Sequence, residues 1–343
     1  MTAEAKSNET TDRLGRNARD LRISVTDRCN FRCVYCMPKK VFGANYKFLP
    51  RAELLSFEEL ERVARAFAQL GVRKLRITGG EPLVRHDLEQ LLERLANIPG
   101  IEDLSMTTNA SLLTRERAEA IKAAGVNRIN VSLDALDDRT FMAINDVGFP
   151  VQRVLDGIQN AEAAGIASIK VNMVVKRGAN EHSIVPMARF FHGTGHIVRF
   201  IEYMDVGHSN GWCLDDVVPT AEIAALIDRE LPIEPTQPNY RGEVAKRWRY
   251  TDGGGEIGII SSVTQPFCGE CTRARLSAVG MLYTCLFATA GHDLRAALRN
   301  GLDDDALRQT VASIWGARAD RYSERRSLAT VNLPKIEMSY IGG

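Results

Sequence analysis

The sequence predicts an α/β fold in which a repeated strand–helix unit builds an incomplete six-stranded (β/α)6 barrel of the TIM type. Three observations lead to this expectation. Helical patterns end at glycines, each glycine is followed at once by a short strand pattern, and the strands share one register of apolar and polar positions. Strands that alternate with helices run parallel and are joined by right-handed crossovers.

Six strands are expected along the first 203 residues. The segment 21–26 alternates apolar and polar residues with the period of two that is typical of a strand. The next helix begins at Ser56, and Glu59 three residues later completes a capping box. The four strands that follow Gly71, Gly100, Gly125 and Gly165 are expected at 72–78, 101–107, 126–132 and 166–172. A sixth is expected at 197–203, after which the pattern stops.

The shared register indicates a polar interior. In the four strands after a glycine, the fourth and sixth residues from the glycine are apolar, whereas the fifth and seventh are polar. Because side chains alternate across a strand, one face of the sheet is polar, and a flat parallel sheet covered by helices on both sides would not have such a face. A barrel with a wet interior fits, and its active site is expected at the carboxyl ends of the strands.

Cations lie on this inner face. Arg22, Arg76 and Lys170 occupy inward positions, and Arg199 lies on the sixth strand. Converging cations suit a polyphosphate or carboxylate ligand. The alternative is that they pair with carboxylates inside the barrel, since buried cations need partners.

Composition limits the function classes. The chain has 343 residues, 45% of them hydrophobic and 25% charged, as is ordinary for a soluble globular protein. A net charge of +1 argues against broad capture of nucleic acid or of a membrane surface, and no apolar run approaches the ~20 residues of a membrane span. Seven cysteines, six of them in two triplets, indicate metal binding in a reducing compartment, for which the cytoplasm is the default.

Three regions are expected. Residues 1–12 are polar and lack the apolar core of a signal peptide, so they are expected to form a disordered tail. The barrel is expected over 13–206. Residues 207–343 are expected to form a region that binds a second metal group and the substrate and ends in a Gly-Gly pair.

The first triplet consists of Cys29, Cys33 and Cys36. Three residues and then two residues separate these cysteines, a spacing that lets one loop hold three corners of an iron–sulfur cluster. No fourth cysteine is near, so one iron would keep an open position, which is a feature of catalytic rather than structural metal sites. The alternative is a structural zinc knuckle whose fourth ligand comes from elsewhere.

The second triplet consists of Cys268, Cys271 and Cys285. Its spacing fits either another cluster or a structural zinc site completed by His292. Arg273 and Arg275 alternate on a strand-like run over 273–278 and so face one way, which suits an anionic or carbonyl-bearing substrate.

Residues 79–82 and the basic run 318–326 can each be interpreted from their own residues. Gly79, Gly80, Glu81 and Pro82 follow the second strand; the glycines would let the backbone approach a ligand closely, and Glu81 would accept a hydrogen bond from an ammonium group. On its own such a tetrapeptide can also be a tight turn. The basic run 318–326 is expected to be a solvated helix face, and Cys213 a packed or loop thiol.

With the first triplet, Tyr35 and residues 79–82 in view, the chain resembles the radical S-adenosylmethionine superfamily. That resemblance implies a cluster whose open iron binds the amino and carboxylate groups of S-adenosylmethionine. Reduction then cleaves this cofactor to a 5′-deoxyadenosyl radical, inside a six-stranded partial barrel.

Longer runs, at 14–16, 20–29, 76–83 and 262–268, resemble one family closely, the GTP 3′,8-cyclases (molybdenum cofactor biosynthesis protein A). The resemblance covers the chain from residue 13 to its end. It implies cyclisation of GTP to 3′,8-cyclo-7,8-dihydro-GTP, the first step of molybdenum cofactor biosynthesis, beginning with removal of the 3′ hydrogen. Two positions depart from the family: Thr272 replaces an asparagine and Ala110 a glycine.

The resemblance also implies the site residues. Both triplets would bind 4Fe-4S clusters, and Arg22, Arg273 and Arg275 would have catalytic roles. The residues expected to bind S-adenosylmethionine are Tyr35, Gly80, Glu81, Ser132 and Met204. The residues expected to bind GTP are Arg22, Arg76, Thr107, Lys170, Arg199, Arg273, Ala274 and Arg275.

The resemblance to the family also implies the partners of the chain. The resemblance implies a low-potential electron donor of flavodoxin or ferredoxin type and a downstream cyclic pyranopterin monophosphate synthase, with a monomer or homodimer and no nucleic acid or membrane. It also implies that the final glycine pair reaches into the active site. Two rival interpretations stay open: a peptide-modifying radical enzyme with an auxiliary cluster, and a zinc-stabilised binding module without catalysis.

Overall fold

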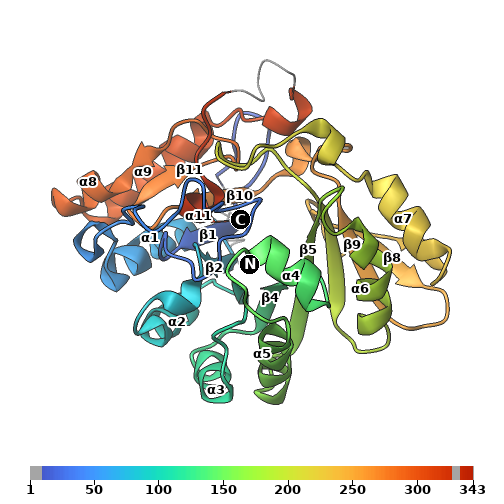
Figure 1. The fold of residues 1–343 in the computed structure, drawn as a ribbon. Coiled ribbons are helices and arrows are strands. Elements are labelled where there is room, and N and C mark those ends of the chain that lie inside the picture. The colour runs from blue at the N-terminus through green and yellow to red at the C-terminus, as the bar shows by residue number, and fades with distance from the viewer. Residues whose placement is uncertain (1–9, 327–332, 343) are drawn as a thin grey trace, which may run out of the picture.

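The computed structural model describes residues 10–326 and 333–342, and a single large sheet lies at its centre (Figure 1). In the described chain this sheet has twelve strands, in the order β12-β11-β10-β1-β2-β3-β4-β5-β6-β9-β8-β7. The six strands that the sequence predicts lie side by side in chain order and are parallel; they are β1 (Asp20–Ser24), β2 (Lys74–Thr78), β3 (Asp103–Thr108), β4 (Arg128–Ser132), β5 (Ser168–Val175) and β6 (Ile197–Glu202).

The predicted register of these strands is confirmed. Leu75 pairs with Leu104, and Ile77 with Met106, and these side chains are at most 2% exposed. In β5 every second residue is buried. Each apolar side chain fully removed from water contributes roughly 1.5–3 kcal/mol, so this face holds the helices against the sheet.

Helices connect the parallel strands. The segments are α1 (Phe57–Gln69), α2 (Leu88–Ala96), α3 (Arg115–Ala123), α4 (Asp138–Asn145), α5 (Gln152–Ala163) and α6 (Ile184–Phe191). At the start of α1 the Ser56 hydroxyl accepts from the Glu59 amide, and the Glu59 carboxylate accepts from the Ser56 amide, so the expected capping box is present. Gly71 and Gly125 have φ of +102° and +100°, the left-handed conformation that a glycine past a helix end adopts without strain.

The chain after residue 206 extends the same sheet at both edges. Strand β9 (Glu256–Ile260) pairs in parallel with β6, and β10 (Arg273–Leu276) pairs in parallel with β1. Antiparallel strands complete the two edges: β7 (Ile233–Thr236), β8 (Lys246–Tyr250), β11 (Met281–Tyr283) and β12 (His292–Asp293). The second triplet therefore flanks the pair of β10 and β11, and β10 lies directly beside the strand that precedes the first triplet.

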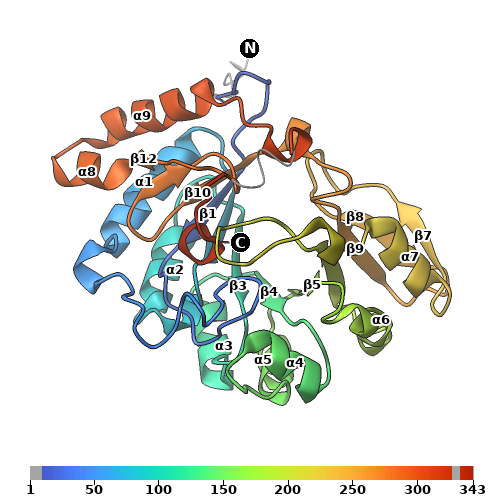
Figure 2. The ribbon, with the colours of Figure 1, turned by 45° about the horizontal axis from the view of Figure 1, so that its top comes forward.

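The C-terminal helices are α7 (Thr220–Asp228), α8 (Leu294–Arg299), α9 (Asp304–Ala317) and α11 (Met338–Ile341). Helix α9 packs on α1, and α11 lies beside β1 near the middle of the sheet (Figure 2). The expected solvated helix over 318–326 is wrong: α9 ends at Ala317, and the side chain of Arg318 is 1% exposed. Among the described residues no helix is both long and apolar enough to cross a membrane.

Candidate active site

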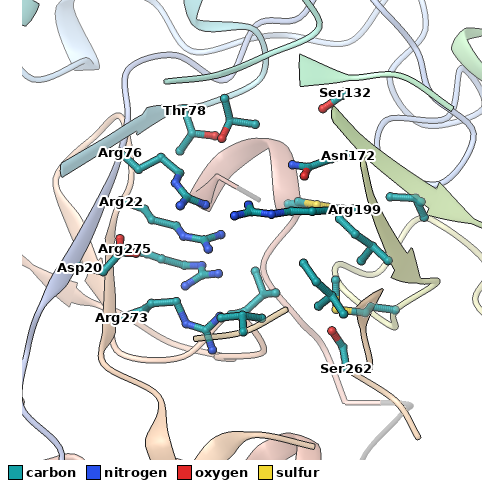
Figure 3. Close-up of a pocket in the computed structure, with 18 of the residues that line it drawn as sticks. Asp20, Arg22, Arg76, Thr78, Ser132, Asn172, Arg199, Ser262, Arg273 and Arg275 are labelled. Atoms are coloured by element: carbon teal, nitrogen blue, oxygen red, sulfur yellow. The ribbon is translucent and has the colours of Figure 1, made fainter. Parts of the chain in front are cut away.

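Strands of the sheet line a cavity of about 510 Å³, which we call the chamber (Figure 3). Residues from β1 to β6 and from β10 line it, as do Ile260 at the end of β9 and the loops that follow the strands. All six cysteines of the two triplets border this one space. The two triplets, which are more than 230 residues apart in the sequence, therefore border a common interior.

The first triplet lies on the loop after β1, and internal hydrogen bonds hold that loop. The Arg32 guanidinium donates to the Cys29 carbonyl at 2.8 Å and to the Phe42 carbonyl at 2.7 Å. The Phe31 amide donates to the Cys29 sulfur at 3.4 Å. Burial, together with the Glu81 carboxylate, raises the pKa of the Cys29 thiol to about 12. A bound metal group would reverse this shift, since a coordinating thiol is deprotonated outright.

Glu81 is an anchor of this end of the chamber. Its carboxylate is 1% exposed and accepts from the amides of Leu83 and Asn109 at 3.0 and 2.7 Å and from the Thr108 hydroxyl at 2.7 Å. Burial raises its pKa to about 7. The structure therefore gives Glu81 three protein donors, whereas the sequence predicted an open acceptor for an ammonium group.

The paired glycines before Glu81 are required by close backbone approach. A Cβ at Gly80 would lie 2.3 Å from the Arg28 carbonyl oxygen, and Gly79 has φ of +143°. Ala110, at a position where the resembled family has glycine, adopts φ of +55°. Few residues other than glycine adopt this conformation readily, which explains the family's usual residue there.

Asp134 is a second buried carboxylate at this end, and the sequence analysis missed it. It is 3% exposed, accepts from the Tyr35 hydroxyl at 2.7 Å and accepts from the Val174 amide at 2.9 Å. Burial raises its pKa to about 6. Its position two residues past Ser132, just beyond the end of β4, was the available signal. The end of the chamber at the first triplet thus holds two carboxylates.

The opposite end is basic. Arg22 on β1 pairs directly with Arg76 on β2 and with Arg275 on β10, so three guanidiniums lie side by side on neighbouring strands (Figure 3). The Nε atom of each is buried without a hydrogen-bond partner. Burial, then the charges of Arg76 and Arg275, lower the pKa of Arg22. Like charges directly opposite on a sheet are destabilising, so the row suits an anionic ligand.

Asp20 is the carboxylate that faces this row. Burial alone would raise its pKa, but Arg76, Arg22 and Arg273, with Arg275, outweigh burial and lower it. Asp20 is one negative charge against these four guanidiniums, and Glu102, Glu243 and Asp320 also line the chamber. Arg199 adds a further guanidinium from the opposite wall (Figure 3), where it donates to Asn130 at 3.3 Å.

The second triplet lies among these cations. The Cys271 sulfur accepts from Arg273 Nε at 3.4 Å and from Nη2 at 3.2 Å. Burial would raise the pKa of Cys271, but the charges of Arg273 and Arg318 lower it to about 6. Burial raises the pKa of Cys285 to about 11.

The predicted site residues divide into two groups. Those that line the chamber are Arg22, Tyr35, Arg76, Gly80, Glu81, Thr107, Ser132, Arg199, Met204, Arg273 and Arg275. Lys170 and Ala274 do not line it. The Ala274 side chain points to the other face of β10 and is 1% exposed in the hydrophobic core. Burial and the neighbouring Arg199 lower the pKa of Lys170 to about 8.

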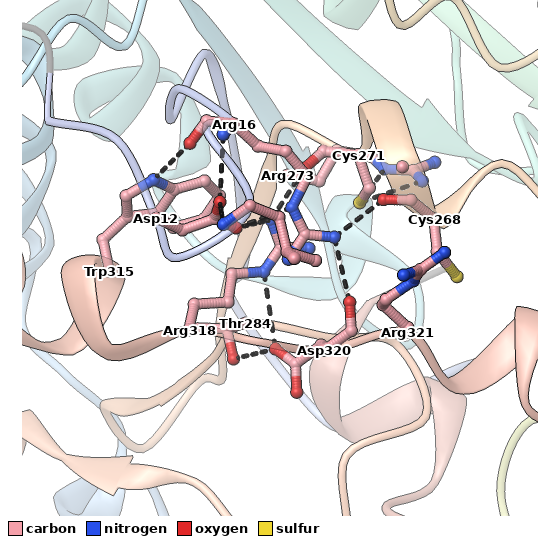
Figure 4. Close-up of polar contacts among 12 residues, drawn as sticks. Asp12, Arg16, Cys268, Cys271, Arg273, Thr284, Trp315, Arg318, Asp320 and Arg321 are labelled. Carbon is pink, nitrogen blue, oxygen red and sulfur yellow. Dashed lines mark hydrogen bonds and ion pairs between the residues drawn. The ribbon is translucent and has the colours of Figure 1, made fainter.

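A buried network behind the second triplet was also missed (Figure 4). Asp12 accepts from Arg16 Nε at 2.6 Å and from Arg318 Nη1 at 3.3 Å. Arg16 donates to the Cys268 carbonyl at 2.7 Å, and Arg318 donates to the Cys271 carbonyl at 2.7 Å. Asp12 is 5% exposed, so the expected disordered tail over 1–12 is wrong at its last residues, and residues 1–9 lie outside the described residues.

The C-terminal segment closes against the chamber. Asp205 accepts from Lys335 Nζ at 2.8 Å, from the Tyr322 hydroxyl at 2.6 Å and from Arg326 Nε at 3.0 Å. Gly342 is buried, and a Cβ there would lie 2.1 Å from a side-chain carbon of Thr78, a chamber residue. The other member of the final pair, Gly343, lies outside the described residues.

The donor sets fit iron–sulfur clusters. Each triplet supplies three free thiols to the chamber, and amide or guanidinium hydrogens point at Cys29 and Cys271, as in the second shells that tune such clusters. Within 10–326 and 333–342, no three His, Cys, Asp or Glu side chains are placed to hold a single metal ion. His292 is exposed on β12, away from the chamber lining.

Comparison with family models finds two matches. Residues 23–191 match the model described as the radical SAM superfamily, and residues 196–324 match the model described as Molybdenum Cofactor Synthesis C. Together the two models span the cysteines of both triplets.

Similar proteins agree with these models. The chain is 52% identical to a GTP 3′,8-cyclase of Acidothermus cellulolyticus over 357 aligned residues, covering 97% of this chain and 98% of that protein. It is 49% identical to a GTP 3′,8-cyclase of Staphylococcus aureus over 336 residues, with the same coverage. Among solved structures, Streptococcus suis SuiB bound to S-adenosylmethionine superposes with a TM-score of 0.61 at 16% identity, covering 93% of this chain and 72% of that one. At that identity the likeness concerns the fold alone.

Proposed function

The chain belongs to the GTP 3′,8-cyclase family, radical S-adenosylmethionine enzymes of molybdenum cofactor biosynthesis, and we propose that the chamber is its active site. The observation that carries this proposal is the opposite charge of the two ends. Buried carboxylates lie beside the first triplet, whereas a row of buried guanidiniums lies beside the second. S-adenosylmethionine bears a sulfonium and an ammonium cation, and GTP bears a triphosphate, so each end suits one of the two molecules.

At the carboxylate end, the first triplet would hold a 4Fe-4S cluster. When bound there, this cluster and S-adenosylmethionine supply the 5′-deoxyadenosyl radical that takes the 3′ hydrogen of GTP. Gly80 lets this turn pack against the Arg28 carbonyl at the edge of the cofactor space, and Ser132 and Met204 line the same space. The Tyr35 hydroxyl donates to Asp134, and this hydrogen bond holds the Tyr35 ring in place.

At the basic end, Arg22, Arg76 and Arg275 would bind the triphosphate. Their Nε atoms have no protein partner, and guanidinium groups recognise phosphate with paired hydrogen bonds. Binding of the triphosphate would relieve the repulsion within the row, which would add to substrate affinity. Thr107 and Arg199 would contact GTP from the other wall, and Arg273 would bridge it to the second triplet.

The second triplet would hold a second 4Fe-4S cluster that orients the guanine. The nearby guanidiniums of Arg273 and Arg318 favour the thiolate of Cys271, which is the form that ligates iron. Lys170 and Ala274 are less suited to contact GTP by their side chains than predicted, since neither lines the chamber. Lys170 would act through its charge, and Ala274 through its backbone.

The other predictions from the sequence stand as predictions. These are the partial-barrel description of the fold, the division at 206/207, an electron donor of flavodoxin or ferredoxin type, a downstream cyclic pyranopterin monophosphate synthase, a monomer or homodimer, and a cytoplasmic location. Gly342 would complete the chamber wall beside Thr78.

The test incubates the anaerobically reconstituted, reduced protein with S-adenosylmethionine and one nucleotide at a time, and measures 5′-deoxyadenosine. We expect its release to depend on GTP and to be weak with ATP or with guanosine, which lacks the triphosphate. Release that never depends on GTP would contradict the substrate assignment. Iron and zinc analysis of the same sample is the companion measurement: two clusters correspond to about eight iron per chain.

A further inference from the structure

The loop that follows the first triplet has an unusual charge. Residues 28–51 contain six arginines and lysines and no aspartate or glutamate. The whole chain has a net charge of +1, so the remainder carries a net charge of −5. A local excess of one sign on a nearly neutral protein points to a local binding task rather than to general solubility.

One of these cations, Arg32, stabilises the loop itself. Arg32 donates to the carbonyls of Cys29 and Phe42, which ties the loop to the first triplet. The rings of Phe42 and Tyr46 lie 4.7 Å apart, and those of Tyr46 and Phe48 lie 4.8 Å apart. The guanidinium of Arg32 also lies over Phe48 at 5.3 Å, a cation–π contact. The loop is therefore packed around an aromatic centre and is not a loose connection.

The remaining cations face solvent. Lys39, Lys40, Lys47 and Arg51 are exposed. Lys39 pairs with Asp146 at 3.2 Å, whereas Lys40, Lys47 and Arg51 form no ion pair with any described residue. Two apolar side chains, Val41 and Tyr46, are 45% and 41% exposed among them. Basic residues around exposed apolar and aromatic side chains are typical of a protein-binding surface.

Residues next to the loop add to its positive charge. From α8, Arg295 donates to the Glu53 carbonyl at 2.9 Å and Arg299 to the Ala52 carbonyl at 3.4 Å, so two more cations border the loop.

Acids also border the loop, and most of them have partners. Glu59 pairs with Arg299 and Asp146 with Lys39, whereas Glu53 lies beside the loop. The Asp27 carboxylate accepts from the Leu49 amide at 2.8 Å, and Glu337, which acts on Tyr46, accepts from the His208 amide and the Ser209 hydroxyl.

The charged loop lies next to the first triplet. Lys39 lies three residues after Cys36, so this surface is joined to the first triplet by Met37 and Pro38 alone. Cys29 and Cys33 pack on their inner side against the hydrophobic core. Because the proposed reaction needs an electron at this triplet, the electron must enter from a surface that the triplet loop reaches.

We propose that the exposed residues of 39–51, here called the basic platform, dock an acidic one-electron carrier protein. The carrier loses one electron and the cluster on the first triplet gains it. This inference rests on the proposed function, since only a cluster in that position needs the electron. Long-range attraction between the platform and an acidic partner would raise the association rate and make it sensitive to salt.

The experiment compares two double charge reversals that change the net charge equally. K40E/K47E reverses the platform, and R153E/R229E reverses two exposed arginines on α5 and at the end of α7. Each variant is assayed for GTP-dependent 5′-deoxyadenosine formation with two reductants, dithionite and a reduced, acidic flavodoxin.

With flavodoxin at low salt, we expect K40E/K47E to lower kcat/KM for the carrier about tenfold or more and to flatten its salt dependence, while R153E/R229E stays near the unaltered protein. With dithionite, both variants should retain activity within about twofold. Equal losses with both reductants, equal losses in both variants, or a raised KM for GTP in K40E/K47E would each overturn the proposal. Loss of GTP dependence with dithionite in the unaltered protein would instead refute the proposed function.

Discussion

The two triplets present the same chemistry in opposite surroundings. Around the first, Glu81 and Asp134 are buried carboxylates, and burial raises the pKa of every thiol. Around the second, buried guanidiniums outweigh burial and lower the pKa of Cys271 to about 6. The cysteine spacing indicates a metal group at each triplet, and the surrounding charge indicates which ligand each end suits.

The difference indicates a division of labour within one chamber. In the proposed function, a cationic cofactor would be attracted to the carboxylate end, and a polyanionic substrate to the guanidinium end. The two molecules would then meet in the middle without competing for one pocket. The experiments below test whether the ends are as independent as this comparison implies.

Replacing a first-triplet cysteine should have the largest effect. In Cys36→Ser we expect iron to fall from about eight to about four per chain and 5′-deoxyadenosine formation to fall to background, because the cluster loses a ligand. The second cluster should keep its spectrum. Loss of both clusters together would show that the two ends are not independent.

Removing Asp12 should damage only the second end. In Asp12→Ala, Arg16 and Arg318 lose a shared buried carboxylate, and breaking such a pair costs about 3–5 kcal/mol of unfolding free energy. We expect a lower urea midpoint and an altered electron paramagnetic resonance spectrum of the second cluster, with S-adenosylmethionine cleavage by the first retained. The exposed ion pair at Arg115 supplies the control: Glu119→Ala should change neither measurement.

Removing Arg275 should separate binding from stability. In Arg275→Ala we expect kcat/KM for GTP to fall about 10- to 150-fold, since a hydrogen bond to a charged group contributes about 1.5–3 kcal/mol. The same change relieves repulsion in the arginine row, so the apo protein should be no less stable. Arg275→Lys keeps the positive charge but lacks the paired donors, so its kcat/KM for GTP should lie between that of the unaltered protein and that of Arg275→Ala. A variant that binds GTP normally would contradict the assignment of the row.

Replacing Asp205 should have the smallest effect, and the effect on the free energy of unfolding should depend on pH. Burial would raise the pKa of Asp205, but Lys335, Tyr322 and Arg326 hold it below the ordinary value of 3.8. Stabilisation by a carboxylate of lowered pKa is fully present above the ordinary value and is lost as pH falls through the lowered one.

We therefore expect Asp205→Asn to lose about 1–3 kcal/mol at pH 7 and to differ less from the unaltered protein near pH 3. Urea unfolding at the two pH values measures this. A difference that stays constant with pH would show that the carboxylate charge does not hold the C-terminal segment.

Local patterns in the sequence predicted most of the fold. The glycines that end helices, the capping box at Ser56 and the strand register all depend on neighbours a few residues apart. The inward side chains of Arg22 and Arg76 followed from the same period of two.

Contacts between distant segments escaped prediction. Arg318 was expected in solvent because a basic run usually is, yet it lies against Asp12, 306 residues away in the sequence. Lys170 was expected in the chamber by its register, but it lies outside the lining because the register gives the face of a strand and not the height along it.

One spectroscopic measurement tests the division of labour most directly. It uses C29S/C33S/C36S and C268S/C271S/C285S, each retaining one cluster, and records electron paramagnetic resonance spectra with S-adenosylmethionine or GTP added. We expect GTP to change the spectrum only where the second triplet is intact, and S-adenosylmethionine only where the first is. A spectrum that GTP changes in the variant with the first triplet alone, and leaves unchanged in the other, would contradict the account.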